Sequence, residues 1–355
     1  MAAQLCGLLV LAEKSSFQTR LIALVPIILS QFSLTDDKLV KKKSLEEFGC
    51  SEDHHIFQVF QLILKLCAHC PDFLKQTEPI ENLAVHTQKL LAHPHQWVRL
   101  VAAQFLGFVL SSLDMVRLEE LVDTGVKEET GYLFSNPLET LHSLALDLCA
   151  QLEPEYINAE MANQVVKNLV FIARVLQRVP PSDTDKKPNL LWLTRRMLRI
   201  INSEVIAANS STVLRMEIFK WIAGIATIID LENVFPILNY LLAPLVREIL
   251  ITDKSNVSLR HMARQVTNVL KQRVGLERYT RSLAAVQHKM NVKRAERKRS
   301  RAQMAITDPE LYAKKKMKKN EKKKESKKRK LSEVTGKQRK RVKKTVIELD
   351  NDELL

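Results

Sequence analysis

The sequence predicts an all-α fold, and three observations support that prediction. Apolar residues recur at helical spacing almost everywhere in the first 274 residues, as in Ile56, Val59 and Phe60, whereas period-two alternation is nearly absent. Only 8 glycines occur among 355 residues, and aromatic residues make up 6% of the chain. Leucine, alanine and lysine are abundant, and these residues favour helices. A β-sandwich or a glycine-looped nucleotide fold is therefore disfavoured.

The periodicity places the helices between clear breakers. Prolines and one glycine interrupt the pattern, among them Pro71, Pro94 and Gly275. Two polar stretches, 34–53 and 114–131, are expected to be longer loops. The expected helices are 4–13, 17–32, 55–69, 80–92, 96–113, 137–151, 157–178, 189–207, 212–229, 235–250 and 257–274.

Three of these helices share one pattern, which is counted from an arginine that follows an aliphatic residue. The repeat-motif arginines are Arg99, Arg215 and Arg260. Apolar residues stand three, six and ten positions after each arginine, at Ala102, Phe105 and Val109, at Ile218, Trp221 and Ile225, and at Ala263, Val266 and Leu270. This spacing predicts one apolar stripe per helix. One repeat takes about 40 residues if three repeats separate the first two arginines, which is typical of two-helix repeat units.

The stretch from His93 to Leu110 reads HPHQWVRLVAAQFLGFVL and resembles the second helix of a HEAT repeat, in which a turn precedes Val-Arg, a small residue and leucines. Gln96 stands where that family often has an acidic residue, and two of the three copies have Leu before Arg. The resemblance implies a HEAT-like or armadillo-like α-solenoid of antiparallel helix pairs. A single compact helical domain is the alternative, although about 275 helical residues are many for one core.

Motifs of enzyme chemistry are missing from the sequence. It contains no glycine-rich phosphate-binding motif, no GxSxG nucleophile motif and no HExxH metal motif. We therefore expect no catalytic residue, no cofactor and no small-molecule substrate. No apolar stretch reaches the roughly 18 residues that a membrane span needs, so no membrane partner is expected.

A single CxxC motif, formed by Cys67 and Cys70, is the candidate for a metal site. No second motif follows at zinc-finger spacing, and zinc needs four ligands. Cys67 also continues the apolar stripe of its helix. We interpret both cysteines as packing residues and expect no bound metal. The histidines that could complete such a site are His54, His55, His93 and His95.

The tryptophans Trp97, Trp192 and Trp221 are candidates for stacking on nucleic-acid bases. Trp221 lies within an apolar stripe, and the other two begin helices beside aliphatic residues. We therefore interpret all three as packing anchors.

A strongly basic segment lies near the C-terminus. Residues 289–344 hold 25 of the 55 lysines and arginines with only six carboxylates, whereas the other 299 residues carry a net charge of −4. Such a segment has too few apolar residues to form a core and is suited to a polyanion. Nucleic acid is the commonest polyanion, because each neutralised phosphate releases counterions. A solubilising or nuclear-targeting tail is the alternative, and the two roles are compatible.

Two helices are expected in this segment. A weak apolar stripe after Gly275 leads into the first basic residues, so the last repeat helix is expected to continue as a long basic helix. A second helix is expected to begin at Asp308, with Asp308 as N-cap and Pro309 at its first position. Because Tyr312 is its only aromatic residue, the segment is expected to contact phosphates without reading bases.

The candidate site residues follow from these clusters. The candidate RNA-phosphate contacts are Lys293, Arg294, Arg297, Lys298, Arg299, Arg301, Lys314, Lys315, Lys316, Lys318, Lys319, Lys322, Lys323 and Lys324. Two further clusters have the form of nuclear-import signals. Their residues are Lys327, Lys328, Arg329, Lys330, Lys337, Arg339, Lys340 and Arg341.

Three stretches together resemble the C-terminal end of the DRIM (down-regulated in metastasis) family of very large HEAT-repeat proteins. They are IFQVFQLILKLCAHCPDFL from Ile56 to Leu74, the adjoining HPHQWVRLVAAQFLGFVL, and the lysine-rich KKRKLSEV. The resemblance implies a nucleolar scaffold of the small-subunit processome that acts in pre-rRNA processing. Its implied partners are pre-rRNA or small nucleolar RNA, processome proteins and an import receptor. Because family members are several times longer, we expect this chain to be a fragment or an isoform of such a protein, or otherwise to represent only part of its length.

The expected organisation has three parts: a helical repeat region over 1–275, a basic helical extension over 276–306, and a largely disordered basic tail over 307–355 that ends in acidic residues. The leading hypothesis for function is a non-catalytic scaffold whose basic tail binds RNA. An importin-like or armadillo-like transport or adaptor solenoid is the alternative, although a carrier has little reason for an appended polycation.

Overall fold

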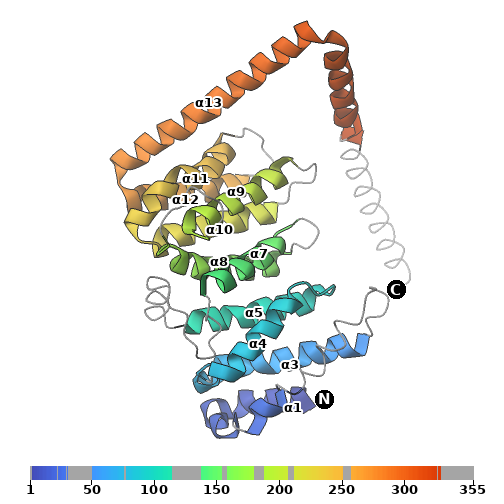
Figure 1. The fold of residues 1–355 in the computed structure, drawn as a ribbon, viewed down its shortest axis with the longest axis vertical. Helices are drawn as coiled ribbons and strands as arrows, with labels where there is room; N and C mark the ends of the chain where they lie inside the picture. The colour runs from blue at the N-terminus through green and yellow to red at the C-terminus, as the bar shows by residue number, and fades with distance from the viewer. Residues whose placement is uncertain are drawn as a thin grey trace, which may run out of the picture. The chain divides into compact units, whose positions relative to one another are not determined.

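The computed structural model describes residues 2–21, 23–28, 30, 50–75, 77–113, 137–153, 158–179, 188–206, 212–250, 257–325 and 327–328. These residues form helices and short connections, and none of them lies in a strand, so the described part of the chain is all-α as expected (Figure 1). The chain divides into two compact units, residues 1–286 and 287–355.

Helices of the first unit pack on one another in chain order. One series of contacts runs through α1 (Ala2–Glu13), α3 (Cys50–His69), α5 (Gln96–Ser112), α8 (Ala159–Leu176), α10 (Thr212–Ile228) and α12 (Val257–Val274). The helices α4 (Thr77–Leu90), α7 (Pro137–Ala150), α9 (Leu190–Ile206) and α11 (Leu231–Ile249) pack against members of this series. Figure 1 shows the resulting succession from α1 to α12.

The apolar stripes predicted from the arginine pattern form the core between these helices. All nine positions at offsets three, six and ten are buried: Ala102, Phe105, Val109, Ile218, Trp221, Ile225, Ala263, Val266 and Leu270. They belong to α5, α10 and α12, which are members of the same packing series. The prediction of one buried stripe per helix is therefore confirmed for all three copies.

Local signals begin and end several helices. The Asn158 side chain accepts a hydrogen bond from the Met161 amide at 2.6 Å and caps α8. Asn189 caps α9 in the same way, through the Trp192 amide at 2.8 Å. Gly275 separates α12 from α13 (Leu276–Thr307) with a φ of 81°, in the left-handed region that favours glycine.

Three boundaries differ most from the expected ones. α3 begins at Cys50, five residues earlier than expected, and Asp53 in its first turns is held by the distant His93 and His95. Residues Lys14–Arg20 form the 3-10 helix η1, where an α-helix was expected from position 17, and a shorter 3-10 helix, η3, covers Pro71–Phe73.

The third difference is the start of α11, which begins at Leu231 rather than at 235 and contains Pro236. Burial of Val234 and Ile237 on both sides of the proline offsets the hydrogen bond that proline cannot donate. Of the two expected loops, residues 34–49 and 114–131 lie outside the described residues.

Polar side chains also join successive helices. The Asn168 amide of α8 donates to the Ala103 carbonyl of α5 at 2.8 Å and is fully buried. Gln164 donates to the oxygen of the same Asn168 at 2.9 Å. A Cβ added at Gly107 would meet both of these side chains at less than 3 Å, so a glycine leaves room for this contact.

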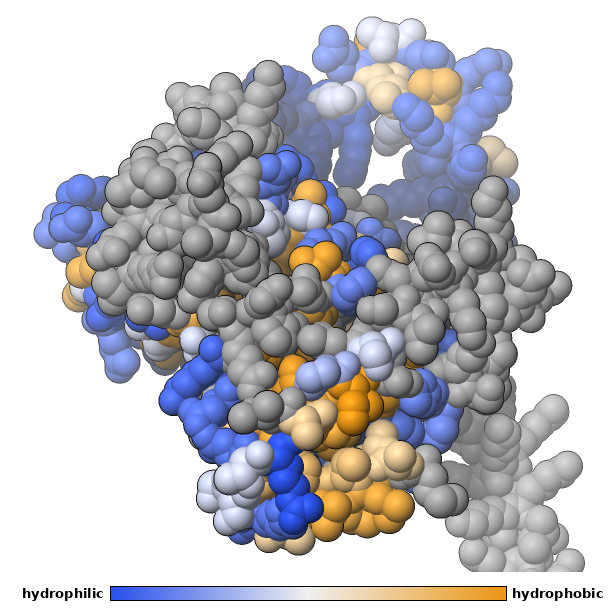
Figure 2. All heavy atoms as spheres, turned by 60° about the horizontal axis from the view of Figure 1, so that its bottom comes forward, coloured by the Kyte–Doolittle hydropathy of each residue, from blue (hydrophilic) through white to orange (hydrophobic). Residues whose placement is uncertain are grey.

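The α1 end of the first unit exposes apolar side chains. α1 contains no charged residue before Glu13, and Leu5 and Leu8 are more than half exposed. Figure 2 turns this end toward the viewer and shows apolar atoms gathered on its surface. Helices that are apolar on all sides are usually covered by other structure.

The second unit contains the later part of α13 and a helix over residues 309–325. α13 is one continuous helix of 32 residues, so a long basic helix is present, but it begins after Gly275 and does not continue the last repeat helix, α12, as was expected. Residues 309–325 are also helical, and 329–355 lie outside the described residues. The three-part division of the chain stays a prediction.

Candidate nucleic-acid interface

Basic side chains cover the later part of α13. Beyond Val286, none of the residues of this helix is buried. The six candidate phosphate contacts here are all exposed: Lys293, Arg294, Arg297, Lys298, Arg299 and Arg301. Because an α-helix turns by about 100° per residue, five of these six charges fall within an arc of about 140°, and Arg299 lies on another side of α13.

The helix over 309–325 carries the other eight candidate contacts. Its start is capped as predicted, because the Asp308 carboxylate accepts a hydrogen bond from the Leu311 amide at 2.9 Å. All eight lysines are exposed: Lys314, Lys315, Lys316, Lys318, Lys319, Lys322, Lys323 and Lys324. The structure therefore presents each of these ammonium groups to solvent from an ordered helix.

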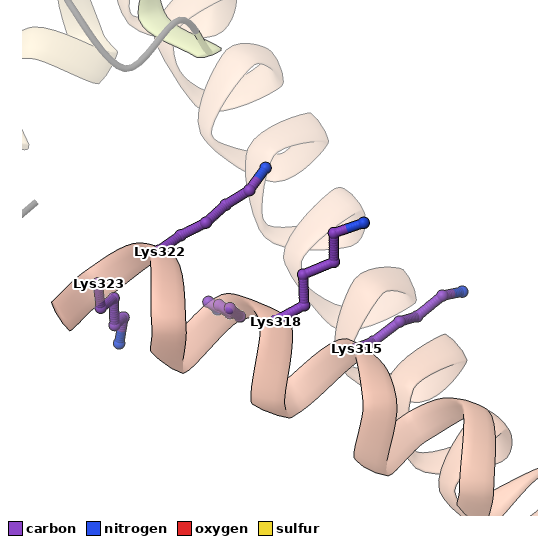
Figure 3. A pocket seen from close by; sticks show the side chains of 5 residues that line it. Lys315, Lys318, Lys322 and Lys323 are labelled. Atoms are coloured by element: carbon purple, nitrogen blue, oxygen red, sulfur yellow. The ribbon is translucent and has the colours of Figure 1, made fainter. Parts of the chain in front are cut away.

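Five of these lysines line one shallow hollow on the helix: Lys315, Lys318, Lys319, Lys322 and Lys323. Figure 3 shows that Lys315, Lys318 and Lys322 extend to the same side of the helix, whereas Lys323 points elsewhere. We call these five residues the lysine face. Its members are three, four or seven residues apart along much of its length, which is the spacing that places side chains together on a helix.

Few of these charges are engaged within the described residues. Lys314, which is outside the lysine face, approaches Glu310 at 3.8 Å, and both side chains are exposed. Lys315 lies 3.6 Å from the sulfur of Met304. Exposed ion pairs of this kind contribute little to stability. The ammonium groups can therefore turn to an external anion at small cost.

The import clusters are only partly described. Lys327 and Lys328 are exposed and helical. The other six residues, Arg329, Lys330, Lys337, Arg339, Lys340 and Arg341, lie outside the described residues.

The repeat-motif arginines lie in the first unit, and two of them are interior residues. Arg99 is buried and donates to the carbonyls of His93 and Pro94 at 2.7 and 2.8 Å, which fixes the turn before α5. Arg215 is buried and pairs with Glu248 of α11 at 3.0 Å. Arg260 is half-buried. The first two arginines therefore stabilise helix packing and do not face an external ligand.

Both cysteines of the CxxC motif are buried, as the packing interpretation requires. Burial raises the pKa of the Cys67 thiol to about 12, and it also raises the pKa of Cys70. The Cys70 thiol lies 3.6 Å from the carbonyl of Lys14. Within the described ranges, no group of three histidine, cysteine or acidic side chains is arranged to hold a metal ion.

Two of the candidate histidines instead meet a buried carboxylate that sequence reasoning missed. Asp53 lies 3.4 Å from His93 and 3.0 Å from His95. His93 Nδ1 accepts a hydrogen bond from the His95 amide, which places the proton of neutral His93 on Nε2, facing Asp53. Burial lowers the pKa of His93, although the Asp53 charge acts in the opposite direction. The cluster joins α3 to the turn before α5.

The tryptophans divide into one core residue and two half-buried ones. Trp221 is fully buried. Trp97 packs edge-on against Phe57 and is stacked with His95, with ring centres 5.2 and 5.3 Å apart. The ring of Trp192 packs edge-on against that of His142, with ring centres 4.5 Å apart. Each tryptophan thus has a packing role in the first unit.

Comparison with known proteins gives one family and one curated relative. Residues 1–333 match the family described as "Small subunit processome component 20 homolog, C-terminal". The U3 small nucleolar RNA-associated protein 20 of Schizosaccharomyces pombe is 28% identical over 229 residues, which are 64% of this chain and 9% of that protein. The chain therefore corresponds to a small part of that relative's length. None of the described helices is both long enough and apolar enough to span a membrane.

Proposed function

Because the chain belongs to the family of small subunit processome component 20 homologues, we propose that it is a non-catalytic scaffold in pre-rRNA processing and biogenesis of the small ribosomal subunit. The family match carries this proposal, since it runs from residue 1 to 333 and so includes the helical body and the basic helices. The name of the fission yeast relative associates that protein with U3 small nucleolar RNA. A processome role is therefore favoured over a transport carrier.

The first unit acts in this proposal as an α-solenoid. Its support is the succession α3, α5, α8, α10 and α12, in which each helix packs on the next. Helices that carry a repeat-motif arginine in their first turn recur in this series and bury equivalent stripes. Such an arrangement exposes a long surface relative to its core, which suits a protein that contacts several neighbours in a large particle.

The basic helices supply the RNA contact. Their lysines and arginines after Val286 are exposed, and the described residues after Val286 include one aromatic residue, Tyr312, so contacts go to phosphates and not to base edges. The partner is pre-rRNA or small nucleolar RNA within the particle, beside other processome proteins. The import clusters bind an import receptor, and the protein works in the nucleus and nucleolus.

Crosslinking in cells tests the proposal directly. The tagged full chain is crosslinked to RNA, purified under denaturing conditions, and the bound RNA is sequenced. We expect enrichment of pre-rRNA or small nucleolar RNA over messenger RNA. The matched control ends at Val286 and should lose most of the crosslinks, because it lacks the exposed basic helices. Recovery of no RNA above background, or of messenger RNA alone, would reject the proposed role.

A further inference from the structure

The charges of the helix over 309–325 are separated around its axis. At about 100° per residue, the five members of the lysine face fall within an arc of about 140°. The three carboxylates of the helix, Glu310, Glu321 and Glu325, fall within about 60° on another side, and the two arcs do not overlap. Lys314 and Lys324 also lie outside the lysine face. A basic segment that binds as an unfolded chain does not require its lysines and its carboxylates to lie on different sides of a helix.

The lysine face destabilises the helix when no anion is bound. Residues 315–323 hold six lysines and one glutamate, and like charges three or four residues apart repel one another. Nearby phosphates would relieve the repulsion. The lysine face extends over about 12 Å of helix axis, so several phosphates can be contacted at once. The helix is therefore expected to be most stable when a polyanion lies along this face.

The geometry points to a particular class of nucleic acid. Proteins that bind single strands combine basic residues with several aromatic side chains on which bases stack. Here Tyr312 is the single aromatic residue among described positions 287–325. A rigid row of point charges instead matches the fixed and dense phosphates of a double helix.

We propose that the helix over 309–325 binds double-helical RNA as a folded helix, with the lysine face on the phosphates and the carboxylates turned away. This inference rests on the proposed function, because it takes RNA as the partner. It goes further by naming the form of RNA and the face that contacts it.

Two double variants of the full chain test the face. Lys315→Gln with Lys322→Gln removes two charges from the lysine face, and Lys314→Gln with Lys324→Gln removes two charges from outside it. The pairs are matched in charge and in position along the helix, and glutamine has a helix propensity close to that of lysine. Circular dichroism of each variant verifies that helix content is unchanged.

The measurement is a salt titration of affinity for an RNA duplex and for an unpaired RNA of equal phosphate number. We expect the first variant to flatten the logarithmic salt slope on the duplex by about two units and the second to flatten it by clearly less. We also expect the unmodified chain to bind the duplex more tightly. Asn320→Pro, which interrupts the helix without changing charge, should remove the difference between the two double variants.

Three results would overturn the inference or its basis. Equal flattening by the two double variants would mean that the segment acts as an unstructured polycation. Tighter binding of the unpaired RNA would reject the duplex as the partner. A failure of the unmodified chain to bind either RNA would reject RNA binding itself, and with it the phosphate-contact part of the proposed function.

Discussion

The guanidinium carbon of Arg278 lies 3.8 Å from the centre of the Phe235 ring and joins the first turn of α13 to α11. Eight residues later, Val286 is buried as well. These two contacts explain why the first residues of α13 belong to the same compact unit as the helical body. The basic part of α13 therefore continues from a helix that is anchored at its start.

Replacing Phe235 with Leu should loosen the start of α13. Leucine keeps the apolar bulk but removes the ring, and a cation–π contact at an exposed arginine is worth about 0.5–1 kcal/mol. We expect amide exchange to become about two- to fivefold faster in residues 276–286. The helix α5 serves as an internal control and should not change. Unaltered exchange in residues 276–286 would mean that the ring does not hold the helix.

Removing one partner of the buried pair Arg215 and Glu248 should strongly destabilise the first unit. Both side chains are nearly inaccessible, so Glu248→Leu removes from the buried arginine the carboxylate that it contacts at 3.0 Å. We expect the free energy of unfolding, measured by chemical denaturation, to fall by about 3–5 kcal/mol. The double change Arg215→Met with Glu248→Leu should be much less harmful than the single one. If the free energy of unfolding falls as much in the double variant as in the single one, the loss does not come from breaking the ion pair.

The Cys67 thiol should resist alkylation in the native protein. Its pKa is raised to about 12 by burial, so at pH 8 it is protonated and covered, whereas Cys6 is only half-buried. Iodoacetamide at pH 8 should label Cys6 first and Cys67 only after unfolding, as read by mass spectrometry. Equal labelling rates would show that the α3 region opens readily.

The raised pKa of Cys67 also predicts how the stability of the protein changes with pH. An unfolded thiol ionises near its ordinary value of 9.0, while the native thiol stays protonated up to about 12. The contribution of this thiol is therefore complete below pH 9 and declines as pH rises from 9 toward 12, because the unfolded state binds fewer protons.

Much of the fold could be predicted because the packing repeats along the sequence. The nine stripe positions were assigned from spacing alone, and all of them are buried. The start of α11 was misplaced because Pro236 resembles a helix start, whereas the burial of Val234 that overrides it depends on neighbouring helices. Local signals with their own geometry, such as Asp308 and Gly275, were identified correctly.

The sequence predicted which residues make up the candidate site but not how they are arranged around the helix. Charge density identified the basic residues, whereas the lysine face becomes visible only once residues 309–325 are known to form one uninterrupted helix. The contact of Asp53 with His93 and His95 could not be predicted, because it joins residues that are 40 or more positions apart and has no repeated pattern. The His-Pro-His turn was the one available signal.

Removing residues 287–355 should leave the first unit folded. These residues form a separate compact unit, and none of the described ones is buried. We expect the chain that ends at Val286 to keep its helix content per residue in the first unit and to melt within about 3 °C of the full chain. A collapse of the melting transition would show that the helical body depends on the basic helices.

The most direct test of the account is a salt titration of RNA affinity for the full chain and for the chain that ends at Val286, on two unrelated duplex RNAs of equal length. If six to ten phosphates are contacted, the affinity of the full chain should fall by about 10³–10⁵ between 50 and 200 mM salt, equally for the two RNAs, and the shortened chain should bind weakly throughout. A shallow salt slope, a strong preference for one RNA, or undiminished binding by the shortened chain would contradict a scaffold that holds RNA through the phosphate contacts of its basic helices.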